Sequence, residues 1–376
     1  MKVRTLLLGT AAAFAVVSGA QAADLAVAEP VSYVKVCDAF GTGYWYIPGT
    51  DACLHIGGYV LFDTTGLSSS RAGEATQPAF TALSNPQSYS ASWKFYTEEE
   101  VDVVAKWMTD FGMATAFIAV RGSHDPGTWY KTNAYDGGLA YIDTVYLKIG
   151  GFEAGWDTSL YDYGFLGLID TPSSFDHDIH QNQLSYTASL GGLSAGVSLE
   201  DPRDGVGAAP ATGVSPYTGN FPDVIGAVWG KMGSFDWKWS AGVTDTIYGT
   251  GYGSQLAGTF TWGGSFLRGQ AAVSNGYGAE FGGGLSPIAG NGTVWHVAAQ
   301  GGIAWTSAFQ TLLEGGYLSI PGAHAWEAAA EADWTLAKNL ATGVEFAYWN
   351  QTAGGPYCSG TSCWQVDWRV KASFGG

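Results

Sequence analysis

The feature that most restricts the fold of this chain is a strict alternation of apolar and polar residues within short segments. Residues 364–374 read WQVDWRVKASF, in which aromatic and aliphatic residues occupy every second position. Successive side chains of a β-strand point to opposite faces, so this segment has one apolar face and one charged, polar face. Segments 183–190, 193–200 and 235–244 repeat the pattern. We therefore expect an all-β chain whose strands separate a nonpolar medium from a wet one.

Sixteen segments of strand length are expected, which is an even number. Their predicted ranges are 54–63, 89–107, 113–121, 140–150, 152–157, 183–190, 193–200, 223–231, 234–245, 255–262, 265–274, 293–305, 308–319, 323–335, 340–350 and 363–374. Long and short connections alternate between them, with one exception at Pro321-Gly322. The long connections are 64–88, 122–139, 158–182, 201–222, 246–254, 275–292 and 351–362. Nearly all long loops are thus expected at one end of the sheet.

Two all-β architectures produce this alternation. A β-sandwich buries the apolar face against a second sheet, whereas a membrane barrel turns it toward lipid and lines a lumen with the polar face. The even count and the loop asymmetry favour the barrel, in which short periplasmic turns alternate with long external loops. Trp and Tyr near the strand ends fit interfacial aromatic girdles. We predict a 16-stranded antiparallel transmembrane β-barrel over residues 54–374.

Residues 1–22 have the features of a secretory signal peptide. Lys2 and Arg4 precede an apolar run, and Ala20-Gln21-Ala22 is a small-residue cleavage site. The apolar run is shorter than the roughly 20 residues that a spanning helix needs. The chain carries 33 acidic against 16 basic residues, a net charge of -17, which argues against a nucleic-acid partner. Export to a bacterial outer membrane, with its lipid and lipopolysaccharide, is the expected destination.

Four cysteines follow the predicted signal peptide. Pairing by proximity in sequence joins Cys37 to Cys53 and Cys358 to Cys363. Disulfides fit an oxidising compartment, and the first would clip a local hairpin in the N-terminal segment 23–53. Zinc binding is the alternative, although no His accompanies the second pair.

One block of sequence carries a family resemblance. Residues 36–54 read VCDAFGTGYWYIPGTDACL, followed by Gly58-Tyr59-Val60, and this block resembles the N-terminal signature of alphaproteobacterial (rhizobial-type) outer-membrane porins. Gly150-Gly151-Phe152 is also similar to that family. The resemblance implies a homotrimeric channel whose third external loop folds inward and narrows the pore. The chain differs in that Gly375-Gly376 follow the aromatic Phe374.

The resemblance places the pore constriction at about 158–182. The acidic candidates there are Asp162, Asp170, Asp176 and Asp178, and Asp157 closes the preceding strand. The basic candidates on the inner wall are Lys94, Arg121, Lys148, Lys238, Arg268, Arg369 and Lys371. An acidic loop that faces a basic wall would create a transverse field, which orients hydrated dipolar solutes and disfavours apolar ones. Ordinary solvated loop carboxylates are the alternative interpretation.

The expected function is passive diffusion of small hydrophilic solutes and ions through a water-filled pore, with a mild preference for cations. No catalytic residue, cofactor or metal is expected. Residues 176–180 (DHDIH) could ligate a divalent ion, and Ser123-His124-Asp125 could suggest a hydrolase, but polar loops contain such residues by chance. A sugar- or amino-acid-preferring channel and a surface adhesin or receptor barrel without transport are the alternative functions.

Overall fold

A computed structural model describes most of the chain. The described residues are 35–68, 93–124, 139–164, 166–169, 180–202, 221–246, 249–275, 281, 292–352, 358 and 360–375. The chain divides into two units, Met1–Val36 and Cys37–Gly376, and the description below concerns the second. Within the described ranges, no helix has both the length and the apolar character needed to cross a membrane.

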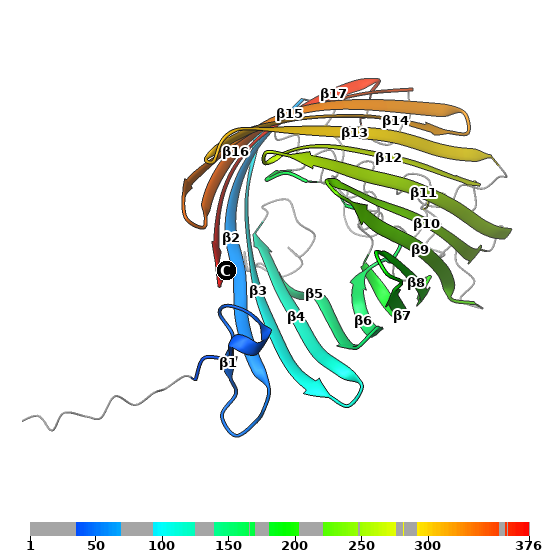
Figure 1. The fold of residues 1–376 in the computed structure, drawn as a ribbon. Coiled ribbons are helices and arrows are strands. Elements are labelled where there is room, and N and C mark those ends of the chain that lie inside the picture. Colours follow the sequence, from blue (N-terminus) through cyan, green and yellow to red (C-terminus); the bar gives the residue numbers. More distant parts are fainter. Residues whose placement is uncertain are drawn as a thin grey trace, which may run out of the picture. The chain divides into compact units, whose positions relative to one another are not determined.

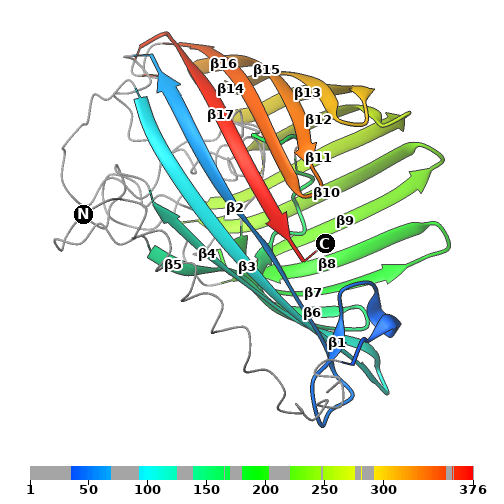
Figure 2. The same ribbon diagram turned by 90° about the vertical axis from the view of Figure 1, so that its left-hand side faces the viewer.

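Sixteen long strands form one closed antiparallel sheet (Figures 1 and 2). They are β2 (Cys53–Leu67), β3 (Trp93–Thr109), β4 (Gly112–His124), β5 (Leu139–Ile149), β6 (Phe152–Thr158), β7 (His180–Ser189), β8 (Leu193–Glu200), β9 (Asp223–Met232), β10 (Phe235–Thr246), β11 (Gly249–Trp262), β12 (Ser265–Asn275), β13 (Thr293–Thr306), β14 (Phe309–Ile320), β15 (Ala323–Ala337), β16 (Leu340–Gln351) and β17 (Ser362–Phe374). Each strand pairs with its neighbours in sequence, which confirms the predicted 16-stranded barrel.

The barrel closes where its first strand meets its last. β17 pairs with β2 from Gln365↔Leu67 to Phe374↔Gly58. Figure 2 shows these two strands side by side. Closure leaves no strand of the barrel with an unpaired edge, which a sheet within lipid requires.

Exposure alternates along the strands as the sequence pattern predicts. On β10, Phe235, Trp239 and Val243 are 37%, 45% and 47% exposed, whereas Ser240 and Thr244 are at most 1% exposed. On β17, Trp368 is 43% exposed. The apolar phase of each strand thus forms the outer face of the cylinder, and the polar phase faces the interior.

The connections divide into a short-turn end and a long-loop end. Two- or three-residue turns such as 110–111 and 190–192 join strands at the short-turn end. One predicted long loop, 246–254, is wrong, because β11 begins at Gly249 and only two residues connect it to β10. Every second residue at the start of β11 is glycine, so the sequence of this segment shows no apolar face that would predict a strand. One of these glycines, Gly253, leaves room for Phe281, because a Cβ on Gly253 would lie 2.4 Å from that of Phe281.

The first disulfide holds a small clip at the start of the barrel. Cys37 and Cys53 are bonded, with their Cα atoms 6.1 Å apart. Between them lie the 3-10 helix η2 (Asp38–Phe40) and the short strand β1 (Trp45–Tyr46), which pairs with the start of β2. The His55 ring contacts the carbonyl oxygen of Gly375. The clip therefore lies at the short-turn end, beside the last residues of the chain (Figure 1).

Candidate functional site: the inner loop and the charged wall

The third long connection, residues 159–179 between β6 and β7, is called the inner loop below. It enters the barrel directly after β6. Ser159 Oγ donates to Glu200 Oε2 at 2.7 Å, and Leu160 N donates to Glu200 Oε1 at 3.1 Å. Ser159 Oγ also accepts the Tyr161 N–H at 3.1 Å, a local bond that tightens the turn. Glu200 is 1% exposed at the end of β8. The loop is thus fastened to the inner wall within its first turn.

The next residues of the loop, 161–163, lie on β10, β11 and β12. Ser240 Oγ donates to Tyr161 O at 2.8 Å, and Lys238 Nζ donates to Asp162 O at 2.5 Å. Tyr163 OH donates to Thr259 Oγ1 at 3.0 Å. The Arg268 guanidinium lies 4.8 Å from the centre of the Tyr163 ring, a cation–π distance. Wall side chains therefore satisfy loop carbonyls and hold a loop aromatic ring.

The described loop then reaches β13, β15 and β17. Leu166 N donates to Gln300 Oε1 at 3.1 Å. Leu168 N and Ile169 N both donate to Glu331 Oε1, at 2.8 and 3.0 Å. Arg369 Nη1 donates to Leu168 O at 2.7 Å. From β8 to β17, the described residues of the loop, 159–164 and 166–169, follow the inner wall instead of projecting from the barrel.

Two glycines allow residues 167–168 of the loop to approach the wall closely. Gly167 has a φ of +157°, and a Cβ there would lie 2.8 Å from Glu331 Oε2. Across the contact, a Cβ on Gly343 would lie 3.1 Å from Leu168 and 2.4 Å from Asp333 Oδ1. A larger residue at either position would force the loop away from the wall.

Two of the five acidic candidates lie within the described residues. Asp162 lies on the inner loop and accepts the Gly164 N–H through Oδ1 at 3.0 Å. Asp157 is on β6 and accepts the N–H of Thr158 at 2.8 Å. Asp170, Asp176 and Asp178 lie outside the described residues. The described part of the loop offers backbone carbonyls to Lys238 and Arg369, so these two contacts do not involve the loop carboxylates.

Six of the seven basic candidates lie on the inner wall, where several meet wall carboxylates. Arg121 contacts Glu100 at 2.6 Å and Asp143 at 3.0 Å. Lys148 contacts Glu153 at 3.0 Å. These pairs join neighbouring strands of the wall.

Arg369 and Lys371 have different environments on β17. Arg369 Nε and Nη2 donate to the two carboxylate oxygens of Asp63 at 2.7 and 2.6 Å. Lys371 Nζ lies 4.0 Å from the centre of the Tyr59 ring. Lys94 is on β3, and its side chain lies outside the described set.

The inner wall carries many acidic residues that were not among the sequence candidates. Ten carboxylates are buried there: Asp63, Asp143, Glu200, Asp223, Glu314, Glu327, Glu331, Asp333, Glu345 and Asp367. All occupy the polar phase of their strands. That phase is readable in the sequence, so the same alternation that selected the basic candidates could have selected these.

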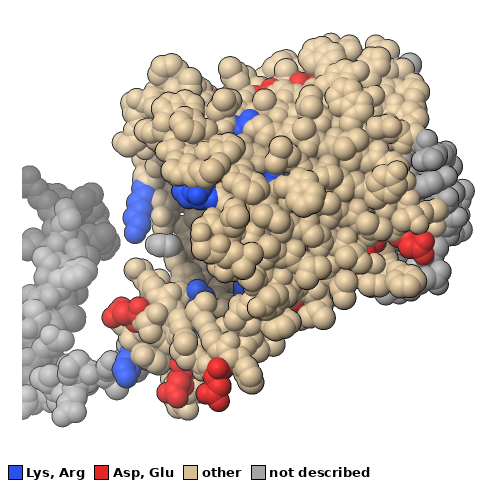
Figure 3. All heavy atoms as spheres, turned by 45° about the vertical axis from the view of Figure 1, so that its right-hand side comes forward, with Lys and Arg blue, Asp and Glu red and all other residues tan. Residues whose placement is uncertain are grey.

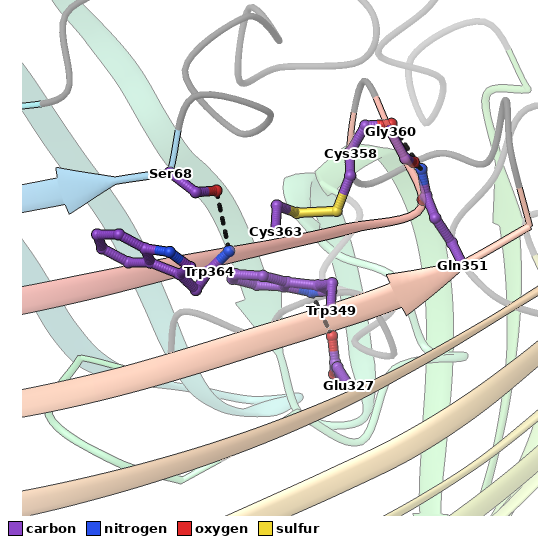
Figure 4. The surroundings of a disulfide bond; sticks show 8 residues. All are labelled: Ser68, Glu327, Trp349, Gln351, Cys358, Gly360, Cys363 and Trp364. Carbon is purple, nitrogen blue, oxygen red and sulfur yellow. Dashed lines mark hydrogen bonds between the residues drawn. A yellow bond between two sulfur atoms is a disulfide. The ribbon is translucent and has the colours of Figure 1, made fainter.

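The last long loop also contributes to the interior (Figure 4). Cys358 and Cys363 are bonded, with Cα atoms 5.7 Å apart, and lie in a buried cluster with Trp349. Trp349 Nε1 donates to Glu327 Oε2 at 2.8 Å. Gln351 Nε2 donates to the carbonyl oxygens of Cys358 and Gly360. Both predicted disulfides are thus confirmed.

Comparisons with known proteins agree with this geometry. A family model described as the porin subfamily matches residues 24–365. Outer membrane protein IIIA of Rhizobium leguminosarum bv. viciae is 34% identical over 255 residues, which are 64% of this chain and 62% of that protein. Porin Omp2b of Brucella canis is 32% identical over 247 residues, 62% of this chain and 64% of that protein. The chain thus spans less than two thirds of the length of these relatives.

Solved structures share the fold. The outer membrane channel DcaP of Acinetobacter baumannii has a TM-score of 0.65 at 16% identity, covering 88% of this chain and 99% of that one. An anion-selective porin from Comamonas acidovorans has a TM-score of 0.55 at 13% identity, covering 86% of this chain and 100% of that one. At identities this low, the likeness shows a shared fold alone.

Proposed function

The chain belongs to the porin subfamily, and on this basis we propose that its barrel is a water-filled channel through which small hydrophilic solutes and ions diffuse passively. The family is one of outer-membrane channels and not of enzymes. The observation that carries the proposal is the inner loop, which lies on a charged wall inside a cylinder with an apolar outer face. A polar lumen lets solutes pass while they keep their hydration, and the inner loop sets the free cross-section.

We further propose a mild preference for cations. Among the described residues, ten buried wall side chains are carboxylates, whereas Arg268 is the only buried Lys or Arg side chain. Excess negative charge in a narrow lumen with low-dielectric walls raises the local concentration of cations. The acidic constriction candidates Asp157, Asp162, Asp170, Asp176 and Asp178 would add to this excess, while the basic wall candidates would oppose it.

Single-channel recording in planar bilayers tests both proposals. The purified protein should conduct, and its reversal potential in a salt gradient should indicate cation preference. The triple variant D162N/D176N/D178N should reduce that preference, whereas D51N, in the exposed clip outside the lumen, should leave it unchanged. Absence of conductance would contradict the channel. A reversal potential that the triple variant does not change would contradict the role of these loop carboxylates.

A homotrimer embedded in outer-membrane lipid is the assembly that we propose. Glu99 and His124 lie 3.5 Å apart on the outer face of β3 and β4, and both are exposed in the single chain. Charged side chains on the lipid face of a barrel cost free energy, and an outer-face ion pair fits better against another copy of the chain. Native mass spectrometry in detergent should find three chains. The variant E99Q/H124Q should shift the distribution toward single chains, and an unchanged distribution would argue against this contact.

A further inference from the structure

A cavity lies between the inner loop and the barrel wall at the short-turn end. Its volume is about 410 Å³, which is within the range of small-molecule sites, about 300–1,000 Å³. The turn between β7 and β8 and the adjoining ends of β8, β9 and β10 form its wall, and Leu160 and Tyr163 of the inner loop complete the described lining. Figure 3 shows Lys and Arg side chains around and within the hollow that opens at this end of the barrel.

The lining is aromatic on both the wall and the loop. Trp229 belongs to the inward phase of β9, two residues from Ala227, which is 3% exposed. On the loop, the centre of the Tyr163 ring lies 4.8 Å from the Arg268 guanidinium, so a positive charge is next to this ring. Leu160 adds aliphatic carbon. Aromatic rings pack favourably against Trp and Tyr, so this part of the cavity suits a flat aromatic solute.

Two lysines and one aspartate are the charged residues of the described lining. Lys238 is directly opposite Trp229 in the register of β9 and β10, and Lys231 is opposite Asp236. Residues two apart on a strand share a face, so both lysines are on the same face of the sheet as Trp229. Lys231 contacts Asp236 at 3.1 Å, which leaves one positive charge in excess.

The contacts of Lys238 leave room for an anionic solute. Its Nζ donates to the backbone oxygen of Asp162 at 2.5 Å, and an ammonium group has three donors. The carboxylates of Asp162 and Glu200 act on Lys238 electrostatically, but they accept the N–H groups of Gly164 and Leu160. Lys231 is the diagonal neighbour of Lys238, within reach of long side chains across the strand pair. A carboxylate, with two acceptor oxygens, can contact both ammonium groups.

We propose that this cavity binds a small aromatic monocarboxylate, with its ring against Trp229 and its carboxylate between Lys231 and Lys238. The inference goes beyond the proposed diffusion channel, because it assigns a binding site to one part of the lumen. The single excess positive charge of the lining matches a monoanion, and the Trp229 and Tyr163 rings match an aromatic group. A small aliphatic anion would use the lysines alone, and a neutral aromatic would use the rings alone.

Saturation-transfer NMR of the detergent-solubilised protein in 0.1 M salt tests the proposal, with benzoate as the probe and empty detergent micelles as the background. Benzoate should bind at least about threefold more tightly than acetate, which lacks the ring, or benzyl alcohol, which lacks the charge. Benzylamine carries the opposite charge and should bind most weakly of the four. If benzylamine binds as tightly as benzoate, the proposed charge selection is wrong.

Variants of the exposed ion pair should change the affinity in opposite directions. K231Q removes the excess positive charge and should weaken benzoate binding about threefold, whereas D236N leaves both lysines unopposed and should strengthen it. K338Q is the matched control, because Lys338 is an exposed lysine in the turn between β15 and β16 at the same end of the barrel. Equal affinities in K231Q, D236N and K338Q would overturn the role of the lysines.

A tryptophan variant tests the site of the ring. W229A should weaken benzoate binding about fivefold, whereas W305A, which removes an outer-face indole that is 60% exposed, should leave it unchanged. Unchanged binding in W229A would overturn the proposal. The measurement needs no ion flow, so a protein that conducts without binding benzoate contradicts the cavity site alone. A protein that binds benzoate without conducting contradicts the channel alone.

Discussion

At the scale of single residues, the ion pair between Arg369 and Asp63 joins the wall to the inner loop. The side chains are 18% and 9% exposed, and Arg369 also donates to Leu168 O. Removing one partner of a buried pair costs about 3–5 kcal/mol, because the other charge stays buried. We expect R369Q to lower the free energy of unfolding in lipid vesicles by an amount at the lower end of this range, measured by urea titration of Trp fluorescence.

A double-mutant cycle and a surface pair serve as controls. D63N/R369Q should be less destabilised than the sum of the two single variants, because no unpaired charge remains. K231Q breaks a pair whose side chains are 65% and 40% exposed, so it should cost less than about 1 kcal/mol. Equal losses of unfolding free energy for K231Q and R369Q would show that the buried pair stabilises the protein no more than the exposed pair does.

At the scale of elements, the segment 166–169 of the inner loop depends on one carboxylate of β15. Glu331 accepts two loop N–H groups, and removing the partner of a buried donor costs about 1–3 kcal/mol for each group left unsatisfied. E331A should therefore free the segment 166–169 and raise the open-channel current noise in bilayer recordings. E327A removes a carboxylate from the same face of the same strand, which accepts the Trp349 Nε1–H. Noise that rises equally in both variants would contradict the attachment.

The N-terminal clip is an element that should open without the barrel. Its disulfide closes a loop with a sequence separation of 16, for which the stabilisation is about 3 kcal/mol. The clip pairs with β2 over only Trp45↔Leu54 and Tyr46↔Cys53. C37S/C53S should therefore make residues 38–52 sensitive to protease while the barrel keeps its heat-modifiable gel mobility. Limited proteolysis with mass spectrometry measures the protease sensitivity of residues 38–52. Loss of the folded gel band would contradict the prediction that the barrel stays folded without this disulfide.

At the scale of the whole molecule, the strands were predictable and the contacts across the lumen were not. One medium lies outside the cylinder and another inside, so alternation of apolar and polar residues marks most of the strands. It fails over 249–254, where every second residue is glycine. Arg369 and Asp63 are 306 positions apart and meet only because the first and last strands close the barrel. No local pattern identifies such partners, nor the loop carbonyls that Lys238 and Arg369 reach.

The same scale decides which face of the cylinder meets lipid. Leu256 lies at the middle of β11 with 57% of its surface exposed, and its neighbour Gln255 is 1% exposed. An arginine on the lipid face near the bilayer midplane costs about 2–4 kcal/mol. L256R should lose this much unfolding free energy in vesicles, relative to L256A, which removes the same side chain without adding charge. If the two variants unfold at the same urea concentration, Leu256 does not face hydrocarbon and the outer face of the barrel must be reassigned.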